Sequence, residues 1–237
     1  MMVKLPMSRL TSIIIDADDT LWESGLFYRK TMDSFVELMK QYGVSPSTVV
    51  NECKARDRES FRLGQYGVCY FNERLRQVCE KFVKKTHDDT CQRRLDNILN
   101  DHYEHPLRLL KDVRNTLVNL KKSGYRLFLY TKGDEEHQLL KINKSRLLPL
   151  FDDYAIVKTK NTMMLKQHLD RWNLKSNEVA VVGDNYTDDI LPALGLVCIT
   201  FYVPHITALG RKICCSQSPD IVVLDNISDI IKYLQQC

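Results

Sequence analysis

The amino-acid sequence predicts an α/β protein whose doubly wound parallel sheet is interrupted, after its first strand, by an all-helical segment. Short apolar runs alternate with helical spacing from about residue 106 onwards, which is typical of parallel βαβ units. Residues 23–105, by contrast, show helical spacing and no convincing strand. With 237 residues, the chain is long enough to form one core and a small inserted domain.

The helical segment is predicted from apolar side chains that recur every three or four residues, as one face of an amphipathic helix requires. Gly43 ends the first of these stripes. Ser45 followed by Pro46 is typical of the cap and first turn of the next helix. The predicted helices cover residues 28–39, a stretch beginning at 46, residues 71–82 and residues 88–103.

The core is predicted from residues 12–16, where three isoleucines run directly into Asp16, and from the elements that follow residue 106. A short β-branched run is typical of a buried strand whose carboxyl end delivers polar groups to a surface. The further predicted strands cover residues 125–131, 154–157, 178–183, 197–202 and 221–224, and the predicted helices cover residues 110–122, 135–144, 164–172 and 227–234.

Composition and charge exclude several classes of protein. Lysine and arginine number 34 against 30 aspartates and glutamates, so the formal charge of +4 indicates no basic field for a nucleic-acid polymer. No apolar run approaches the roughly 20 residues that span a bilayer, and residues 1–10 lack the apolar core of a signal peptide. We therefore expect no membrane partner and a cytoplasmic location.

The eight cysteines form no Cys-x-x-Cys pair, so a structural zinc site is not expected. In a reducing compartment we expect buried or inert thiols. The neighbouring Cys214 and Cys215 are expected to behave in the same way, with a redox-active pair as the alternative.

Polar side chains gather where the predicted strands end, and carboxyl ends of parallel strands meet at the ligand-binding edge of a sheet. Carboxylates held close together repel one another unless a cation lies among them. A set of oxygen ligands without histidine or cysteine indicates Mg²⁺, and a hydroxyl and a lysine beside it suit a phosphate dianion. In chain order the strand ends deliver Asp16, Asp18, Asp19, Thr131, Lys158 or Lys160, Asp184, Asp188 and Asp189.

The spacing of the first two acids predicts their chemistry. Asp16 and Asp18 are two residues apart, so an extended strand would place both on one face. One carboxylate could then attack phosphorus while the other handles the proton of the leaving group. Mg²⁺ would screen the nucleophile from the phosphate, and Lys160 would neutralise the transferring oxygens. Asp188 is expected to be a solvated acid at a helix start.

Four motifs resemble those of the haloacid dehalogenase-like hydrolase superfamily. The run Asp16-Ala17-Asp18-Asp19-Thr20-Leu21 resembles its Asp-x-Asp-x-Thr signature. Thr131, a lysine before a helix, and Gly183-Asp184-x-x-x-x-Asp189 are similar to the second, third and fourth motifs, in the same order. The resemblance covers residues 10–202. The third motif departs from the family pattern because it lacks the common Lys-Pro.

The resemblance implies a role for each matching residue. Asp16 would be the nucleophile that forms an aspartyl-phosphate, and Asp18 the general acid and then base. Thr131 and the main-chain amide of Lys132 would hold the phosphate. Lys160, with Lys158 as the alternative, would be the motif lysine. The implied Mg²⁺ ligands are Asp16, the carbonyl of Asp18, Asp184 and, directly or through water, Asp189.

The resemblance also implies the domain organisation and the activity. Residues 1–22 and 106–237 would form a Rossmann-like catalytic core, and residues 23–105 a helical cap of the first type. We expect a Mg²⁺-dependent phosphatase acting on a small phosphomonoester, such as a nucleotide, a sugar phosphate or a similar metabolite. The alternatives are a phosphoryl-transferring mutase and a non-catalytic ligand-sensing member. A dehalogenase is disfavoured because Asp18 is present.

Overall fold

The computed structural model describes residues 10–83, 89–205 and 220–235. The neighbouring Cys214 and Cys215 lie outside the described residues, as do residues 1–9, for which no signal peptide is expected. The chain divides into two compact units, one of Met1–Ser24 with Leu107–Cys237 and one of Gly25–Pro106. Each unit has its own apolar core. No helix in the described ranges is long and apolar enough to cross a membrane.

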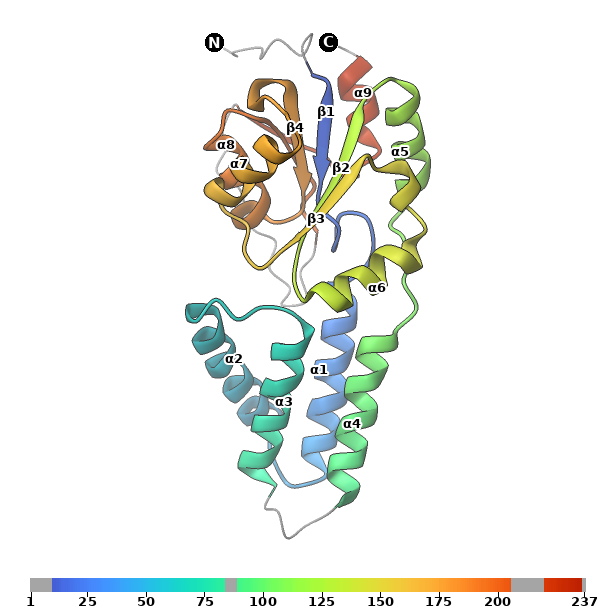
Figure 1. The fold of residues 1–237 in the computed structure, drawn as a ribbon. Coiled ribbons are helices and arrows are strands. Elements are labelled where there is room, and N and C mark those ends of the chain that lie inside the picture. The colour runs from blue at the N-terminus through green and yellow to red at the C-terminus, as the bar shows by residue number, and fades with distance from the viewer. Residues whose placement is uncertain (1–9, 84–88, 206–219, 236–237) are drawn as a thin grey trace. The chain divides into compact units, whose positions relative to one another are not determined.

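A six-stranded parallel sheet forms the centre of the first unit, in the order β3-β2-β1-β4-β5-β6 (Figure 1). In the central pairing, Ile15 lies opposite both Leu129 and Val182, so β1, β2 and β4 end at the same edge of the sheet. The strands are β1 (Ser12–Ile15), β2 (Arg126–Lys132), β3 (Asp153–Val157), β4 (Val179–Gly183), β5 (Ile199–Tyr202) and β6 (Ile221–Val223).

Helices cover both faces of this sheet, which confirms the doubly wound α/β prediction. Because side chains alternate along a strand, Ile13 and Ile15 pack in one core cluster with α5, α6 and α9, whereas Ile14 packs in another with α7 and α8. Figure 1 shows α5 and α9 on the opposite side of the sheet from α7 and α8. The helices are α5 (Val113–Lys122), α6 (Glu135–Ser145), α7 (Thr162–Arg171), α8 (Leu191–Leu194) and α9 (Asp229–Gln235).

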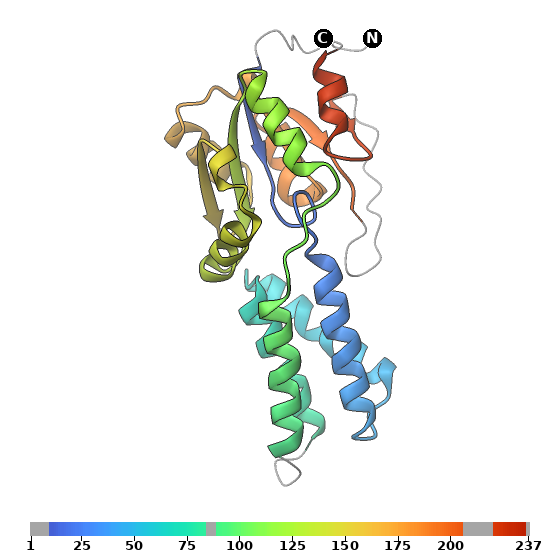
Figure 2. The same ribbon diagram turned by 90° about the vertical axis from the view of Figure 1, so that its right-hand side faces the viewer.

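The second unit consists of four helices around one apolar core that includes Phe35, Leu75 and Leu95. Figure 2 shows α1 and α4 running side by side in this unit. The Ser45 hydroxyl accepts a hydrogen bond from the Thr48 amide (3.2 Å) at the start of α2. The helices are α1 (Gly25–Lys40), α2 (Pro46–Arg62), α3 (Val68–Phe82) and α4 (Asp89–Glu104).

Three predicted elements begin two or three residues later in the structure than in the sequence analysis; one is the last helix, which is predicted from residue 227 and begins at Asp229. The helix predicted from residue 110 begins at Val113, because Asp112 before it has a left-handed backbone with φ of 59°. The strand predicted from residue 197 begins at Ile199, because Val197 has φ of 61°. A β-branched residue rarely adopts this conformation, so the sequence carries no signal for it.

Candidate active site

A cavity of about 240 Å³ lies at the carboxyl ends of β1, β2 and β4, within the first unit. All seven of the predicted site residues line it, together with three neighbours. The lining residues are Asp16, Asp18, Asp19, Thr131, Lys132, Lys160, Asp184, Asn185, Asp188 and Asp189. Parallel register explains this convergence, since strands that end at one edge deliver their following residues to one place.

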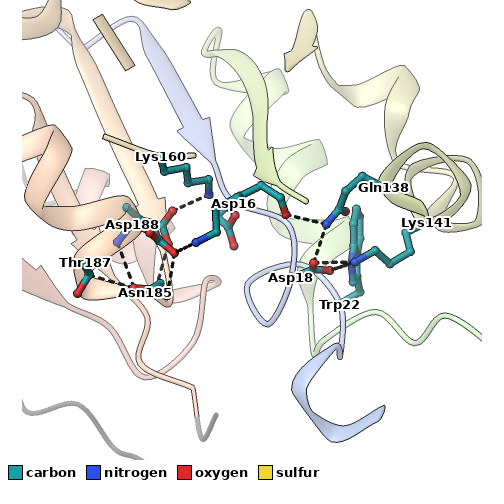
Figure 3. Close-up of polar contacts among 11 residues, drawn as sticks. Asp16, Asp18, Trp22, Gln138, Lys141, Lys160, Asn185, Thr187 and Asp188 are labelled. Carbon is teal, nitrogen blue, oxygen red and sulfur yellow. Dashed lines mark hydrogen bonds and ion pairs between the residues drawn. The ribbon is translucent and has the colours of Figure 1, made fainter. Parts of the chain in front are cut away.

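Asp16 and Lys160 both line the cavity and form a buried ion pair, which Figure 3 draws. The Asp16 amide donates to the carbonyl of Val182 (2.9 Å), which fixes the residue against β4. The Lys160 ammonium donates to Asp16 Oδ1 and also to Asp189 Oδ1 (2.6 Å). Lys158, two residues earlier in the chain, is exposed. Of the two lysines that the sequence leaves open, Lys160 is the one in the cavity.

Three carboxylates form a tight acidic cluster. Carboxylate oxygens of Asp16, Asp184 and Asp189 all lie within 4.8 Å of one another. Burial, together with repulsion from Asp189 and Asp18, raises the pKa of Asp16 to about 7 although Lys160 opposes the shift. Burial and the charges of Asp16 and Asp189 also raise the pKa of Asp184 well above its usual value. One ammonium among three carboxylates leaves an excess of negative charge, which a divalent cation would neutralise.

The end of β4 is built to bring Asp189 back to the cluster. A Cβ on Gly183 would collide with the Asp189 side chain, so only glycine fits there. The amide of Asn185 donates to Asp189 Oδ2 (3.0 Å). Asn185 Oδ1 in turn accepts hydrogen bonds from the amides of Thr187 (3.0 Å) and Asp188 (3.1 Å), as Figure 3 shows. This capped turn explains the spacing of Gly183, Asp184 and Asp189 in the sequence.

Thr131 and Lys132 end β2 beside the acidic cluster. The Thr131 hydroxyl is buried and has no hydrogen-bond partner among the described residues, although it lines the cavity. A buried polar group of this kind is costly unless a ligand or water satisfies it. The Lys132 ammonium forms an ion pair with Asp188. The expectation that Asp188 is merely a solvated acid was wrong, because that carboxylate faces the cavity and binds this cation.

Asp18 has an entirely different environment. Its carboxylate accepts hydrogen bonds from Trp22 Nε1 (2.7 Å), Gln138 Nε2 (2.9 Å) and Lys141 Nζ (2.6 Å), as drawn in Figure 3. Burial would raise the pKa of Asp18, but the charge and hydrogen bonds of Lys141, together with Gln138 and Trp22, lower it below its usual value. Asp18 is therefore a carboxylate surrounded by donors.

The sequence analysis did not identify Gln138 and Lys141. Both are almost fully buried, and they lie three residues apart on one face of α6. One sequence signal points to them: they are two polar residues on the face of the helix that also carries Ile142, which packs in the core. Polar residues in such a position need buried partners.

Comparison with known proteins places this geometry in a family. The haloacid dehalogenase-like hydrolase family matches residues 10–195. The chain is 27% identical over 194 residues to a glyceraldehyde 3-phosphate phosphatase from Pyrococcus furiosus, covering 79% of this chain and 78% of that protein. It is 31% identical over 146 residues to a phosphoglycolate phosphatase from Aliivibrio fischeri, covering 60% and 61%.

The fold also matches solved structures. A haloacid dehalogenase-like family hydrolase from Xanthomonas campestris superimposes with a TM-score of 0.79 at 21% identity, covering 96% of this chain and 97% of that one. At this identity the likeness concerns the fold alone.

Proposed function

Because the chain belongs to the haloacid dehalogenase-like hydrolase family, we propose that it is a Mg²⁺-dependent phosphatase that hydrolyses a small phosphomonoester through an aspartyl-phosphate on Asp16. One observation carries the proposal. One cavity holds a buried carboxylate, an ammonium beside it and a hydroxyl without a partner among the described residues, which suit a nucleophile, a charge partner and a phosphate ligand. Two relatives named as phosphatases support the reaction class.

In the first step, an Asp16 carboxylate oxygen attacks phosphorus. The bond between phosphorus and the leaving oxygen breaks. Asp18, an ionised carboxylate in the substrate-free site, takes up a proton when the substrate binds and gives it to that oxygen, so that an alcohol leaves. The Thr131 hydroxyl and the Lys132 amide bind oxygens of the transferring group. Lys160, which contacts Asp16 directly, orients the nucleophile and neutralises developing charge.

In the second step, water attacks the phosphorus of the aspartyl-phosphate. The Asp18 carboxylate takes a proton from this water, and the bond between phosphorus and the Asp16 oxygen breaks. The products are inorganic phosphate and the free Asp16 carboxylate, while Asp18 has regained the proton that it gave up in the first step. The two aspartates are thus returned to their starting states.

The acidic cluster fits a divalent cation. Asp16, Asp184 and Asp189 supply only oxygen atoms. Their pKa values are raised first by burial and, for Asp16 and Asp184, also by repulsion from neighbouring carboxylates. With the carbonyl of Asp18 the three aspartates would hold Mg²⁺, which when bound supplies positive charge against the phosphate oxygens.

The helical unit of Gly25–Pro106 would serve as the cap that selects the substrate and limits the access of water. Its place in the chain, inserted between β1 and β2, supports this role. The relatives' substrates put two- and three-carbon phosphates first among the candidates.

We also propose a cytoplasmic location, for which the free thiols of Cys53, Cys79, Cys91 and Cys198 are suited.

The test is release of inorganic phosphate from a panel of phosphomonoesters that includes phosphoglycolate, glyceraldehyde 3-phosphate, sugar phosphates and nucleotides. We expect release that requires Mg²⁺, stops with a chelator and is abolished in Asp16→Asn, whose thermal unfolding should stay cooperative. Isomerised sugar phosphate without free phosphate would instead indicate a mutase. Full turnover by Asp16→Asn would overturn the assignment of the nucleophile.

A further inference from the structure

The side chain of Asp18 is held by three donors that lie outside the acidic cluster. Trp22 and Lys141 donate to Oδ1, and Gln138 and Lys141 donate to Oδ2, which makes four hydrogen bonds of 2.6–2.9 Å. Asp18 is not a member of the group of carboxylates whose oxygens lie within 4.8 Å of one another. Figure 3 shows its carboxylate directed toward Gln138, Lys141 and Trp22.

Gln138 joins two strand ends through one amide group. Its Nε2 donates both to the carbonyl of Lys132 at the end of β2 (2.9 Å) and to Asp18 Oδ2 after β1 (2.9 Å). Gly133 makes room for this arrangement, because a Cβ there would lie 2.8 Å from Gln138 Nε2. The backbone of Gly133 has φ of 149°, which L side chains rarely adopt. The local chain is thus shaped around the Gln138 amide.

Lys141 is buried and forms an ion pair with Asp18. Its side chain is 3% exposed, and Asp18 is the acidic group to which its ammonium is bonded. A buried ammonium has a strong requirement for a paired carboxylate, because an unpaired charge there lacks solvation. The pairing is bidentate, so it restrains the orientation of the carboxylate as well as its position.

We propose that Gln138 and Lys141 are positioning residues that orient the Asp18 carboxyl group for proton transfer to and from the substrate oxygen. This inference rests on the proposed phosphatase function, since it concerns the acid of that reaction. Neither residue needs to touch the substrate. They act by keeping the Asp18 side chain out of the acidic cluster and in a single orientation, which a side chain with two free torsions would not hold unaided.

The effect of a misplaced Asp18 carboxyl group depends on the leaving group of the substrate. Protonation by Asp18 matters for an alkyl phosphate, whose alkoxide leaves poorly, and matters little for p-nitrophenyl phosphate, whose phenolate leaves without a proton. The value of kcat/KM reports the steps up to the first irreversible one, which here is the departure of the alcohol. Loss of positioning should therefore lower kcat/KM for the alkyl substrate selectively.

The experiment compares Lys141→Met and Gln138→Leu with wild type on p-nitrophenyl phosphate and on an alkyl phosphate that the wild type hydrolyses. We expect kcat/KM for the alkyl phosphate to fall about tenfold or more and that for p-nitrophenyl phosphate to stay within about threefold. Lys144→Met is the matched control, because Lys144 lies on the same helix and is exposed. It should change neither value.

A double-mutant cycle with Asp18→Asn completes the test. If both residues act through Asp18, Lys141→Met and Gln138→Leu should cause no further loss in the Asp18→Asn background. Equal losses on both substrates, or losses that simply add to that of Asp18→Asn, would overturn the inference. If Lys141→Met does not unfold cooperatively, the Gln138→Leu results decide. A wild type without Mg²⁺-dependent activity on either substrate would instead refute the proposed function.

Discussion

Asp16 and Asp18 are two residues apart and each is bonded to a buried lysine, yet the rest of their surroundings differ. Asp16 shares its space with two other carboxylates. Its pKa is raised to about 7 by burial and by the charges of Asp189 and Asp18. Asp18 is held by three donors, and the charge of Lys141 outweighs the effect of burial, so its pKa is lowered. The comparison teaches that the neighbours supplied by distant elements, and not the residue type, set the electrostatic environment of each aspartate.

The largest expected effect comes from removing the cation on the Asp16 side. Lys160→Met would leave Asp16 and Asp189 without the ammonium that contacts both. We expect kcat to fall by about 10²–10³, the range for loss of one stabilising donor. Steady-state assays with Mg²⁺ measure it. The exposed Lys158, changed to Met, is the matched control and should leave kcat unchanged; a large loss there would return the motif lysine to Lys158.

The second prediction concerns Mg²⁺ and pH. The pKa of Asp16 is about 7 in the folded protein against a usual value of 3.8, so the folded state binds a proton that the unfolded chain has released. The free energy of unfolding of the metal-free protein should therefore fall as the pH rises from about 4 to about 7. Mg²⁺ at about 100 times its Kd should add roughly 2.7 kcal/mol to the free energy of unfolding. At a fixed Mg²⁺ concentration this stabilisation should be larger at pH 8 than at pH 5, because protons compete for the site at pH 5.

Thermal unfolding with and without Mg²⁺ at these two pH values measures this effect. The Lys141→Met variant should keep the stabilisation by Mg²⁺, because Lys141 contacts Asp18 and not the acidic cluster. The Asp184→Asn variant should lose most of this stabilisation. A Mg²⁺ shift that is the same at both pH values, or that survives Asp184→Asn, would show that the acidic cluster is not the metal site.

A smaller effect is expected from the hydroxyl of Thr131. Thr131→Val keeps the shape of the side chain but removes the group that has no partner among the described residues. We expect kcat/KM to fall about tenfold, which corresponds to about 1.4 kcal/mol and to one hydrogen bond with a charged ligand. The free energy of unfolding should not fall, since no internal hydrogen bond is lost. An unchanged kcat/KM would remove Thr131 from the phosphate site.

The sequence predicts the Asp16 side of the site much better than the Asp18 side. Asp16 and Asp184 each follow an apolar strand and Thr131 lies at the end of one, and parallel register makes neighbouring strand ends meet. Their convergence can therefore be derived from local patterns. The same patterns give the six strands and the helical insert, with shifted element ends that include those where Asp112 and Val197 adopt positive φ.

The partners of Asp18 cannot be derived in this way. Gln138 and Lys141 come from a helix more than a hundred residues along the chain, and polar residues in a helix are usually on its solvated face. Their burial depends on how α6 is rotated against the end of the sheet, which helical periodicity alone does not determine. The contact of Asp188 could not be predicted for a similar reason, since its partner Lys132 comes from a strand distant in the sequence.

The central claim is that Asp16 carries the phosphoryl group. Its most direct test uses Asp18→Asn, which should still be phosphorylated by p-nitrophenyl phosphate but should activate water poorly, so that the intermediate accumulates. After an acid quench, mass spectrometry of the peptides should find one phosphoryl group on Asp16, and none when Asp16→Asn is added. Burst release of p-nitrophenolate with the phosphoryl group on any other residue, or turnover with no modified peptide, would contradict the account.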